Sequence, residues 1–257
     1  MYDTRMSTES RHSEIVAALQ REGQVGVAAL AARLATSEVT IRRDLDQLAA
    51  AGVLRRIRGG ATSLMMRGEE RPFAMRGIEA TVAKDRIGRS VAGLIRDGEA
   101  VVLDSGTTGL AAARALAPQR LTVMPLSLQA AVILAASPSI SLLLPGGTVR
   151  FGEQSLVGPL AEAGLAGLRF DTAILTCCGF SPDVGVTAYD LQDAAVKRTA
   201  ISAAARTILI LDSSKFGRTA MAVVCPTTAI DIVITDTAAP DAAIRRLREL
   251  GTEVHLV

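Results

Sequence analysis

Apolar residues recur with helical spacing in three stretches near the start of the chain. The first covers about residues 11–21 and the second, VAALAARL, covers 27–34. A third follows the short break at 35–37 and places apolar residues at i, i+4 and i+7, namely Ile41, Leu45 and Leu48. This spacing puts the apolar side chains on one face of a helix. The chain is therefore expected to begin with three amphipathic helices.

The third helix has recognisable ends, and a basic segment follows it. Ser37 is suited to cap the first turn, because its oxygen accepts a hydrogen bond from an unpaired backbone N–H, and Gly52 is suited to end the helix. The next segment, VLRRIRGGAT at 53–62, roughly alternates apolar residues with arginine and then contains Gly59-Gly60. This pattern predicts a short β-hairpin with a tight turn.

From about residue 84 onward, short apolar runs alternate with helical patterns. Seven runs are predicted to be strands: 100–104, 121–124, 140–144, 172–176, 207–211, 230–235 and 253–257. This alternation predicts an α/β fold, a mainly parallel sheet with helices on both faces. Residues 64–83 lack a clear period and are interpreted as a linker. The predicted organisation is a small domain at 8–63, a linker at 64–83 and an α/β domain at 84–257.

The composition is that of a folded protein. The chain has 257 residues, 49% of them hydrophobic, which is enough for two domains with buried cores. The first residues are polar rather than signal-like, and no apolar run reaches the roughly 18–20 residues of a membrane span. Three cysteines, two of them adjacent, and two isolated histidines fit neither a disulfide framework nor a zinc site. We therefore expect a cytoplasmic protein with no metal and no cofactor.

Positive charge is concentrated in the N-terminal part of the chain. The net formal charge is only +2, yet residues 33–67 contain seven arginines, three acids and no lysine. On the third helix alone, Arg42 could belong to a solvated surface, with ion pairs to Glu38 and Asp46 worth about 0.2–0.5 kcal/mol each. The context favours another interpretation, because helix, turn, helix and basic hairpin are the outline of a winged helix-turn-helix.

Such a domain places the second helix of its motif in the major groove of DNA. One arginine can hold a phosphate while a neighbour reaches a base edge, and arginine with guanine is the commonest specific pairing. Because aromatic residues are only 3% of the chain, duplex DNA is a better target than single strands. The predicted DNA-binding residues are Ser37, Thr40, Arg42, Arg43, Arg55, Arg56, Arg58, Gly59 and Gly60.

A ligand site is predicted in the second domain. In open α/β sheets ligands bind beyond the carboxyl ends of the strands, and here polar or glycine-rich turns follow those ends. The turn DSGTT at 104–108 leads into a helix, where a close backbone, hydroxyls and amides can hold a phosphate. The predicted ligand-binding residues are Asp104, Ser105, Gly106, Thr107, Thr108, Gly146, Gly147, Arg150, Gly179, Asp190, Lys197, Asp212 and Lys215.

Lysine usage draws attention to the same region. The chain has three lysines against twenty-five arginines, and Lys197 and Lys215 both fall in the predicted site. Lys215 closes the strand-end sequence DSSK at 212–215, where it can pair with Asp212 or meet a phosphate as a point charge. Chance placement on the surface is the alternative for each lysine.

Across both regions the sequence resembles the DeoR family of bacterial transcriptional regulators. The matching motifs are SEVTIRRDL at 37–45, RGGA at 58–61, DSGTT at 104–108, PGG at 145–147 and LDSSKFG at 211–217. The resemblance implies a repressor of a carbohydrate operon and a sensor domain with the ribose-5-phosphate-isomerase type of fold. It also implies operator DNA, a phosphorylated sugar effector and self-association into dimers or tetramers as partners.

Parts of the sequence are also compatible with two other functions. A sugar-phosphate isomerase with an appended DNA-binding domain needs a carboxylate base with a raised pKa. Its candidates are Asp104, Asp190, Asp193 and Asp212, with Lys197 or Lys215 for charge stabilisation. A thiol redox sensor would use Cys177 and Cys178, although adjacent cysteines rarely pair because the bridge strains the peptide.

Overall fold

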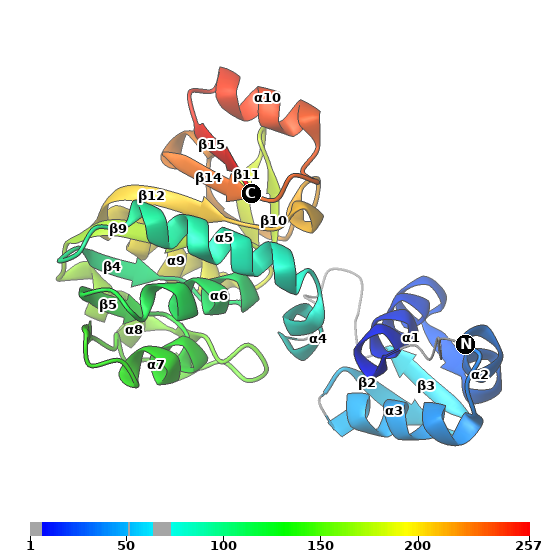
Figure 1. The fold of residues 1–257 in the computed structure, drawn as a ribbon. Helices are drawn as coiled ribbons and strands as arrows, with labels where there is room; N and C mark the ends of the chain where they lie inside the picture. The colour runs from blue at the N-terminus through cyan, green and yellow to red at the C-terminus, as the bar shows by residue number, and fades with distance from the viewer. Residues whose placement is uncertain (1–6, 51, 64–72) are drawn as a thin grey trace. The chain divides into compact units, whose positions relative to one another are not determined.

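The computed structural model describes residues 7–50, 52–63 and 73–257 (Figure 1). The chain divides into two compact units, with the boundary between Glu79 and Ala80. Part of the predicted linker, residues 64–72, lies outside the described residues. The remainder is not irregular, because α4 (Phe73–Ile78) forms there and α5 (Thr81–Leu94) begins three residues before the position expected from the pattern.

The N-terminal unit contains the predicted three helices and hairpin. The helices are α1 (Thr8–Glu22), α2 (Val27–Arg33) and α3 (Glu38–Ala50), and the hairpin consists of β2 (Leu54–Ile57) and β3 (Gly60–Ser63). A short strand that the pattern did not predict, β1 (Gln24–Gly26), pairs with β3 and completes an antiparallel sheet of order β1-β3-β2. The hairpin thus extends a small sheet that is built into the helical core.

The apolar stripes of the helices meet in one core. Ile15 of α1, Leu30 of α2, and Ile41 and Leu45 of α3 are all fully buried, as is Leu54 at the start of the hairpin. Burial of each such side chain stabilises the fold by about 1.5–3 kcal/mol. Ser37 caps α3 as predicted, since its Oγ accepts a hydrogen bond from the N–H of Thr40 at 3.1 Å.

A buried charge on α3 was not predicted. Asp44 is only 2% exposed and accepts hydrogen bonds from the Arg11 guanidinium at 2.5 and 3.0 Å, while the His12 ring lies 3.3 Å away. Both partners, Arg11 and His12, belong to α1, a different helix of the same core. The bidentate pair therefore fixes α3 against α1, and side-chain pairs of this geometry are among the strongest in proteins.

The C-terminal unit is built on a seven-stranded sheet, and all seven predicted strands are in it. They are β4 (Ala100–Leu103), β5 (Leu121–Pro125), β6 (Ile140–Leu142), β9 (Phe170–Leu175), β12 (Ala204–Ile210), β14 (Ile232–Thr235) and β15 (Glu253–Leu256). Their order is β15-β14-β12-β9-β4-β5-β6, and every neighbouring pair is parallel. The sheet reverses its winding at β4 and β9.

Helices cover both faces of the sheet, as predicted. On one face, α5, α6 (Thr107–Leu116) and α7 (Leu128–Ala135) pack on residues such as Val101 and Leu103. On the other, α8 (Pro159–Ala166) and α9 (Leu191–Ala203) pack on residues such as Val102. The strand alternation explains this division, because successive side chains point to opposite faces. The helix α10 (Asp241–Glu249) packs on Val233 and Leu209, on the α9 side.

Several short strands escaped the sequence pattern. The strands β10 (Gly179–Ser181), β11 (Gly185–Ala188) and β13 (Ala222–Cys225) form a small antiparallel sheet, and β7 (Thr148–Val149) pairs with β8 (Leu156–Val157). Each has two to four residues, too few for a period to show. No helix among the described residues is long and apolar enough to cross a membrane.

We expect Gly60→Ser to destabilise the N-terminal unit by about 1–3 kcal/mol or more, because its new Cβ would lie 2.0 Å from the carbonyl oxygen of Val25. The matched control is Gly26→Ser on the paired strand, where the nearest atom lies 4.0 Å away and serine is a preferred helix cap. Thermal unfolding of the full chain, followed by circular dichroism, measures both. Equal stability of the two variants would contradict the close packing of the hairpin on β1.

Candidate DNA-binding surface and effector site

The outward face of α3 carries the two adjacent arginines. Arg42 forms the predicted i,i+4 pair with Glu38 at 3.0 Å, with both side chains about half exposed. Arg43 is exposed and has no hydrogen-bond or ion-pair partner in the described part of the chain. The second pair considered from the sequence, Arg42 with Asp46, is replaced by another contact, because the Asp46 carboxylate accepts from Arg56 at 2.8 Å.

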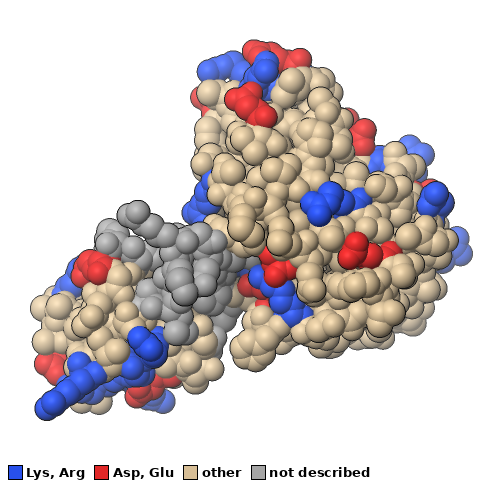
Figure 2. Space-filling view, turned by 180° about the vertical axis from the view of Figure 1, so that it is seen from behind, with Lys and Arg blue, Asp and Glu red and all other residues tan. Residues whose placement is uncertain are grey.

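The arginines of the hairpin are not equivalent. Arg56 donates both to Asp46 of α3 and to the carbonyl of Gly60 at 2.7 Å, so its guanidinium ties the hairpin to α3. Arg55 and Arg58 are exposed, and neither has a partner among residues 7–50, 52–63 and 73–257. Figure 2 shows basic side chains along one side of this unit (lower left). Arg43, Arg55 and Arg58 therefore each present a guanidinium group that no described residue binds.

The other predicted DNA-binding residues shape this surface. The hydroxyls of Ser37 and Thr40 lie 2.9 Å apart at the start of α3. Gly59 has φ of +78°, which glycine adopts without strain, and it closes the turn between β2 and β3. The same turn needs glycine at position 60, where a side chain would meet Val25.

In the C-terminal unit, Asp104 follows β4 at the carboxyl edge of the sheet and is 1% exposed. Its Oδ1 accepts from the N–H of Ser105 at 2.7 Å. Its Oδ2 accepts from the N–H of Thr176 at 2.8 Å and from the Lys197 ammonium. The Thr176 hydroxyl lies 3.0 Å from the same oxygen and 2.7 Å from the carbonyl oxygen of Ser105, and it can donate to either. A buried carboxylate needs such a complete set of donors, because an unpaired buried charge is strongly destabilising.

Lys197 lies on α9 and is buried beneath this edge. Its ammonium pairs with Asp104 and, at 3.5 Å, with Asp193 one turn earlier on the same helix. Burial by itself would lower the pKa of Lys197, but the two carboxylates outweigh it and raise the pKa above its ordinary value. The ammonium is therefore charged at neutral pH, where its contribution to stability is fully present. That contribution declines as the pH rises from the ordinary lysine pKa through the raised value.

The turn after Asp104 leaves several polar groups unused. Gly106 has φ of +96° and precedes α6, whose first turn has no side-chain cap. The hydroxyls of Ser105, Thr107 and Thr108 form no hydrogen bond with any described residue. Unpaired N–H groups at a helix start carry partial positive charge and bind anions. This turn therefore offers donors for an anion directly beside the Asp104–Lys197 pair.

Other strand ends bring further charges to this edge. Asp212, after β12, accepts from the N–H of Ser214 at 3.0 Å and precedes the half-buried Lys215. Cys177 follows β9. The charges of Lys197, Lys215, Asp104 and Asp212 all act on its thiol, so these groups lie near it. Burial nevertheless raises the pKa of the Cys177 thiol to about 12. A neutral, buried thiol is a poor nucleophile, which argues against the redox-sensor alternative.

The remaining predicted ligand-binding residues have mainly structural contacts. Arg150 lies 3.7 Å from Asp190, and Asp190 caps α9 by accepting from the N–H of Asp193 at 2.8 Å. Two glycines make room for neighbouring backbone: a Cβ at Gly147 would lie 2.6 Å from a carbonyl oxygen, and one at Gly179 would lie 2.4 Å from another. Gly146, with φ of +79°, turns the chain before β7.

Two residues of the charged cluster were not among the predicted ligand-binding residues, although Asp193 was a candidate base of the isomerase alternative. Thr176 joins the cluster because β9 lies next to β4 in the sheet. This pairing brings Thr176 and Asp104 together although they are 72 positions apart in the chain. Asp193 joins it through the i,i+4 spacing to Lys197 on α9. That spacing is visible in the sequence, and it would have indicated Asp193 once α9 was recognised as a helix with a buried lysine.

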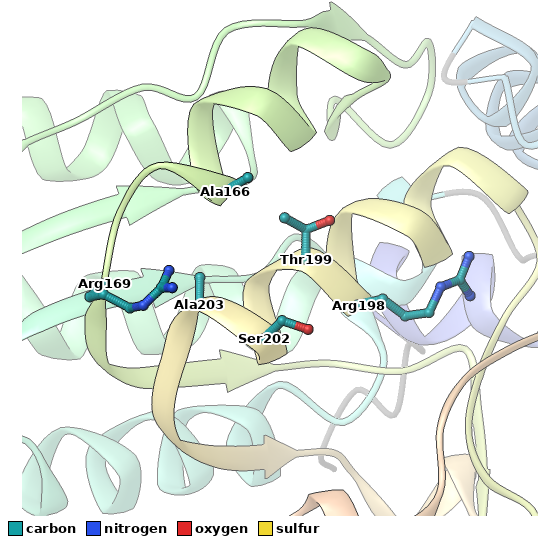
Figure 3. A pocket seen from close by; sticks show the side chains of 6 residues that line it. All are labelled: Ala166, Arg169, Arg198, Thr199, Ser202 and Ala203. Atoms are coloured by element: carbon teal, nitrogen blue, oxygen red, sulfur yellow. The ribbon is translucent and has the colours of Figure 1, made fainter.

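A hollow on this unit lies elsewhere. It is lined by Ala166, Arg169, Arg198, Thr199, Ser202 and Ala203 (Figure 3). These residues belong to the carboxyl ends of α8 and α9 and to the segment that enters β9, which is the amino edge of the sheet. Arg198 points away from the other labelled side chains and donates to the carbonyl of Val223 at 2.8 Å. The hollow therefore lacks a converging set of polar groups.

Across the described residues, no group of three or more His, Cys, Asp or Glu side chains could hold a metal ion.

Two family models match the chain over most of its length. The model of the DeoR-like helix-turn-helix domain matches residues 11–66, and that of the DeoR C-terminal sensor domain matches residues 79–237. The chain belongs to the DeoR family. This protein is thus a DNA-binding transcriptional regulator, not an enzyme, and its C-terminal unit is a DeoR sensor domain.

The DeoR-family relatives are similar over almost their whole length. Transcriptional repressor AccR of Agrobacterium fabrum is 33% identical, with 90% of each chain covered. The putative aga operon transcriptional repressor of Escherichia coli O157:H7 is 32% identical, covering 97% of this chain and 94% of that one. The glycerol-3-phosphate regulon repressor of Escherichia coli K12 is 30% identical, covering 98% and 100%.

Two solved structures that resemble this DeoR-family chain do so only distantly. Ribose 5-phosphate isomerase A from Methanocaldococcus jannaschii has a TM-score of 0.37 and 15% identity, covering 52% of this chain and 53% of that one. A probable sor operon regulator from Shigella flexneri has a TM-score of 0.37 and 13% identity, covering 53% and 78%. Similarity at this level says nothing about the residues of the site.

We expect Lys197→Met to destabilise the sensor domain by about 3–5 kcal/mol, because it leaves the buried carboxylate of Asp104 without its cation. The matched control, Lys215→Met, removes a half-buried lysine from the same edge and should cost less than about 1 kcal/mol. Urea unfolding measures both. The double variant Asp104→Asn/Lys197→Met should recover part of the lost stability, because it removes the unpaired carboxylate. If Lys197→Met were as stable as Lys215→Met, the buried Asp104–Lys197 ion pair would be contradicted.

Proposed function

We propose that this protein represses a carbohydrate operon and that a phosphorylated sugar, bound at the carboxyl edge of the sensor sheet, controls its affinity for operator DNA. The observation that carries the proposal is the turn at 104–108, where three unused hydroxyls and an uncapped helix start lie beside a buried ion pair. The names of two relatives, repressors of an aga operon and of a glycerol-3-phosphate regulon, support the same class of function.

In the DNA-binding half, α3 enters the major groove and the β2–β3 hairpin contacts the adjacent backbone. Arg43 reads a base edge, since it is exposed, unpaired and on the outward face of α3. Arg55 and Arg58 hold phosphates from the hairpin, and Arg42 adds a phosphate contact at the edge of α3. Ser37, Thr40, Arg56, Gly59 and Gly60 keep these groups in position. Because operators of such regulators mirror a protein two-fold axis, we expect the chain to act as a homo-oligomer.

In the sensor half, the phosphate binds at the start of α6. The N–H groups of Thr107 and Thr108 and the hydroxyls of the turn donate to its oxygens, and Lys215 supplies a nearby positive charge. The sugar lies toward Asp104, whose carboxylate accepts hydrogen bonds from sugar hydroxyls, and toward Asp190 and Arg150. Asp104 and Lys197 serve as charged walls rather than as a proton-transfer pair, because Oδ2 of Asp104 already accepts from Thr176 and Lys197. Oδ1 has one donor, the N–H of Ser105, and is the oxygen left to accept from the sugar.

Control of DNA binding requires that the effector bind one arrangement of the protein more tightly than another. Lys197 connects the effector edge to α9, and Asp193 ties the first turn of that helix to the same ammonium. A ligand that competes for Asp104 therefore acts on α9 as well as on the turn. We infer that displacement of α9 is the first step by which binding is communicated.

Arg43→Ala should weaken binding to a specific duplex by about 1–3 kcal/mol and change binding to random duplex much less. The duplex is one selected from a randomised pool by the wild-type protein, and affinities are compared at one salt concentration by fluorescence anisotropy. Arg114→Ala, an exposed and unpaired arginine of the sensor domain, is the control. Wild-type affinity of the Arg43 variant for both duplexes would contradict base reading by Arg43.

A phosphorylated sugar should stabilise the protein, whereas its unphosphorylated parent should not. At a hundredfold excess over the dissociation constant, binding to the folded state adds about 2.7 kcal/mol, seen as a rise in melting temperature. Thr107→Ala should reduce this rise, while Thr228→Ala, an exposed threonine before β14 at the amino edge of the sheet, should leave it unchanged. If no phosphosugar raises the melting temperature, the effector class is wrong. If a phosphosugar raises it equally in Thr107→Ala, the placement of the phosphate at the 104–108 turn is wrong.

A further inference from the structure

Val39 lies at the centre of the outward face of α3. A helix turns by about 100° per residue, so Val39 and Arg43, two residues before and two after the buried Ile41, both point away from the core. They are i,i+4 neighbours and lie side by side on this face. Val39 is 76% exposed and occupies the second position of the helix, two residues after the Ser37 cap.

The fold gives no reason for a valine at this position. Its side chain contacts solvent rather than the core, and β-branched residues are disfavoured in helices relative to alanine. Single exposed valines are common, and Val82 of α5 and Val132 of α7 are exposed to 69% and 67%. What distinguishes Val39 is its surroundings, because Arg42 and Arg43 follow it on the helix that belongs to the DNA-binding domain.

We propose that Val39 selects thymine in the operator by packing its methyl groups on the C5-methyl group of the base. The thymine methyl is the one apolar group that a base pair presents in the major groove, and apolar side chains recognise it. In helix-turn-helix proteins the first residues of the recognition helix are those that meet base edges. The assignment rests on the proposed docking of α3, and it adds an apolar determinant to the arginine contacts.

The proposed contact should distinguish thymine from uracil. Uracil presents the same hydrogen-bonding groups as thymine and lacks only the methyl group, so replacing thymine by deoxyuridine isolates the contact. Burial of one methyl group is worth about 0.8 kcal/mol, which corresponds to about a fourfold change in affinity. Val39 is uncharged, so its contribution does not depend on the number of counterions released from the DNA.

The test uses the full chain and a duplex selected by the wild-type protein from a randomised pool. Each T·A pair of the duplex is changed in turn to U·A, and affinity is measured for wild type, Val39→Ala and the control Val82→Ala. We expect one position in each half-site at which uracil weakens binding by wild type and by Val82→Ala about fourfold, while binding by Val39→Ala is unchanged. The salt dependence of binding should be the same for all three proteins.

Two results would overturn the proposal. One is insensitivity of the wild-type protein to uracil at every thymine, and the other is an unchanged uracil effect in Val39→Ala. The Arg43→Ala variant separates this failure from that of the docking model: if Arg43→Ala loses specific binding but the uracil effect is absent, only Val39 was assigned wrongly. If both substitutions leave binding to the selected duplex unchanged, α3 is not the reading helix and both assignments fall.

Discussion

One buried ammonium group organises the sensor domain. Lys197 reaches from α9 to the end of β4, where it meets Asp104, and the same carboxylate collects Thr176 from the neighbouring strand. These contacts join the two strands at which the sheet reverses its winding, the position where open α/β sheets bind ligands. Because a lone charge could not remain buried there, the cluster persists only as a complete set. The adjoining turn at 104–108 is held in place by this set while keeping its own hydroxyls unused.

The DNA-binding domain is built by the same principle. Asp44 is buried against Arg11, and Asp46 holds Arg56, so two acids of the basic segment serve to position α3 and the hairpin. Among the described residues, Arg43, Arg55 and Arg58 have no partner in the domain, and all three are exposed. The adjacency of Arg42 and Arg43 is thereby explained: the first is balanced by Glu38 along the helix, and the second projects from its outer face.

The features that depend on short-range periodicity could be predicted from the sequence. The seven parallel strands, the three first helices and the Ser37 cap are all present where the pattern put them. Asp104 and Lys197 were both candidate residues, but their pairing was not predictable, since it requires β4 and β9 to be neighbours and α9 to cross beneath them. Thr176 depends on the same adjacency. The role of Arg56 also lay beyond the pattern, because an alternating hairpin does not reveal which arginine faces α3.

The link from Arg56 to both α3 and the hairpin turn has a mechanical consequence. With its guanidinium bonded to Asp46 on one side and to the Gly60 carbonyl on the other, the separation between helix and hairpin is preset. In the proposed docking, a set span between α3 and the hairpin favours DNA whose major groove and flanking backbone match it. Base sequence alters groove width and bending stiffness, so base pairs that no side chain touches can still be discriminated by the strain of fitting this span.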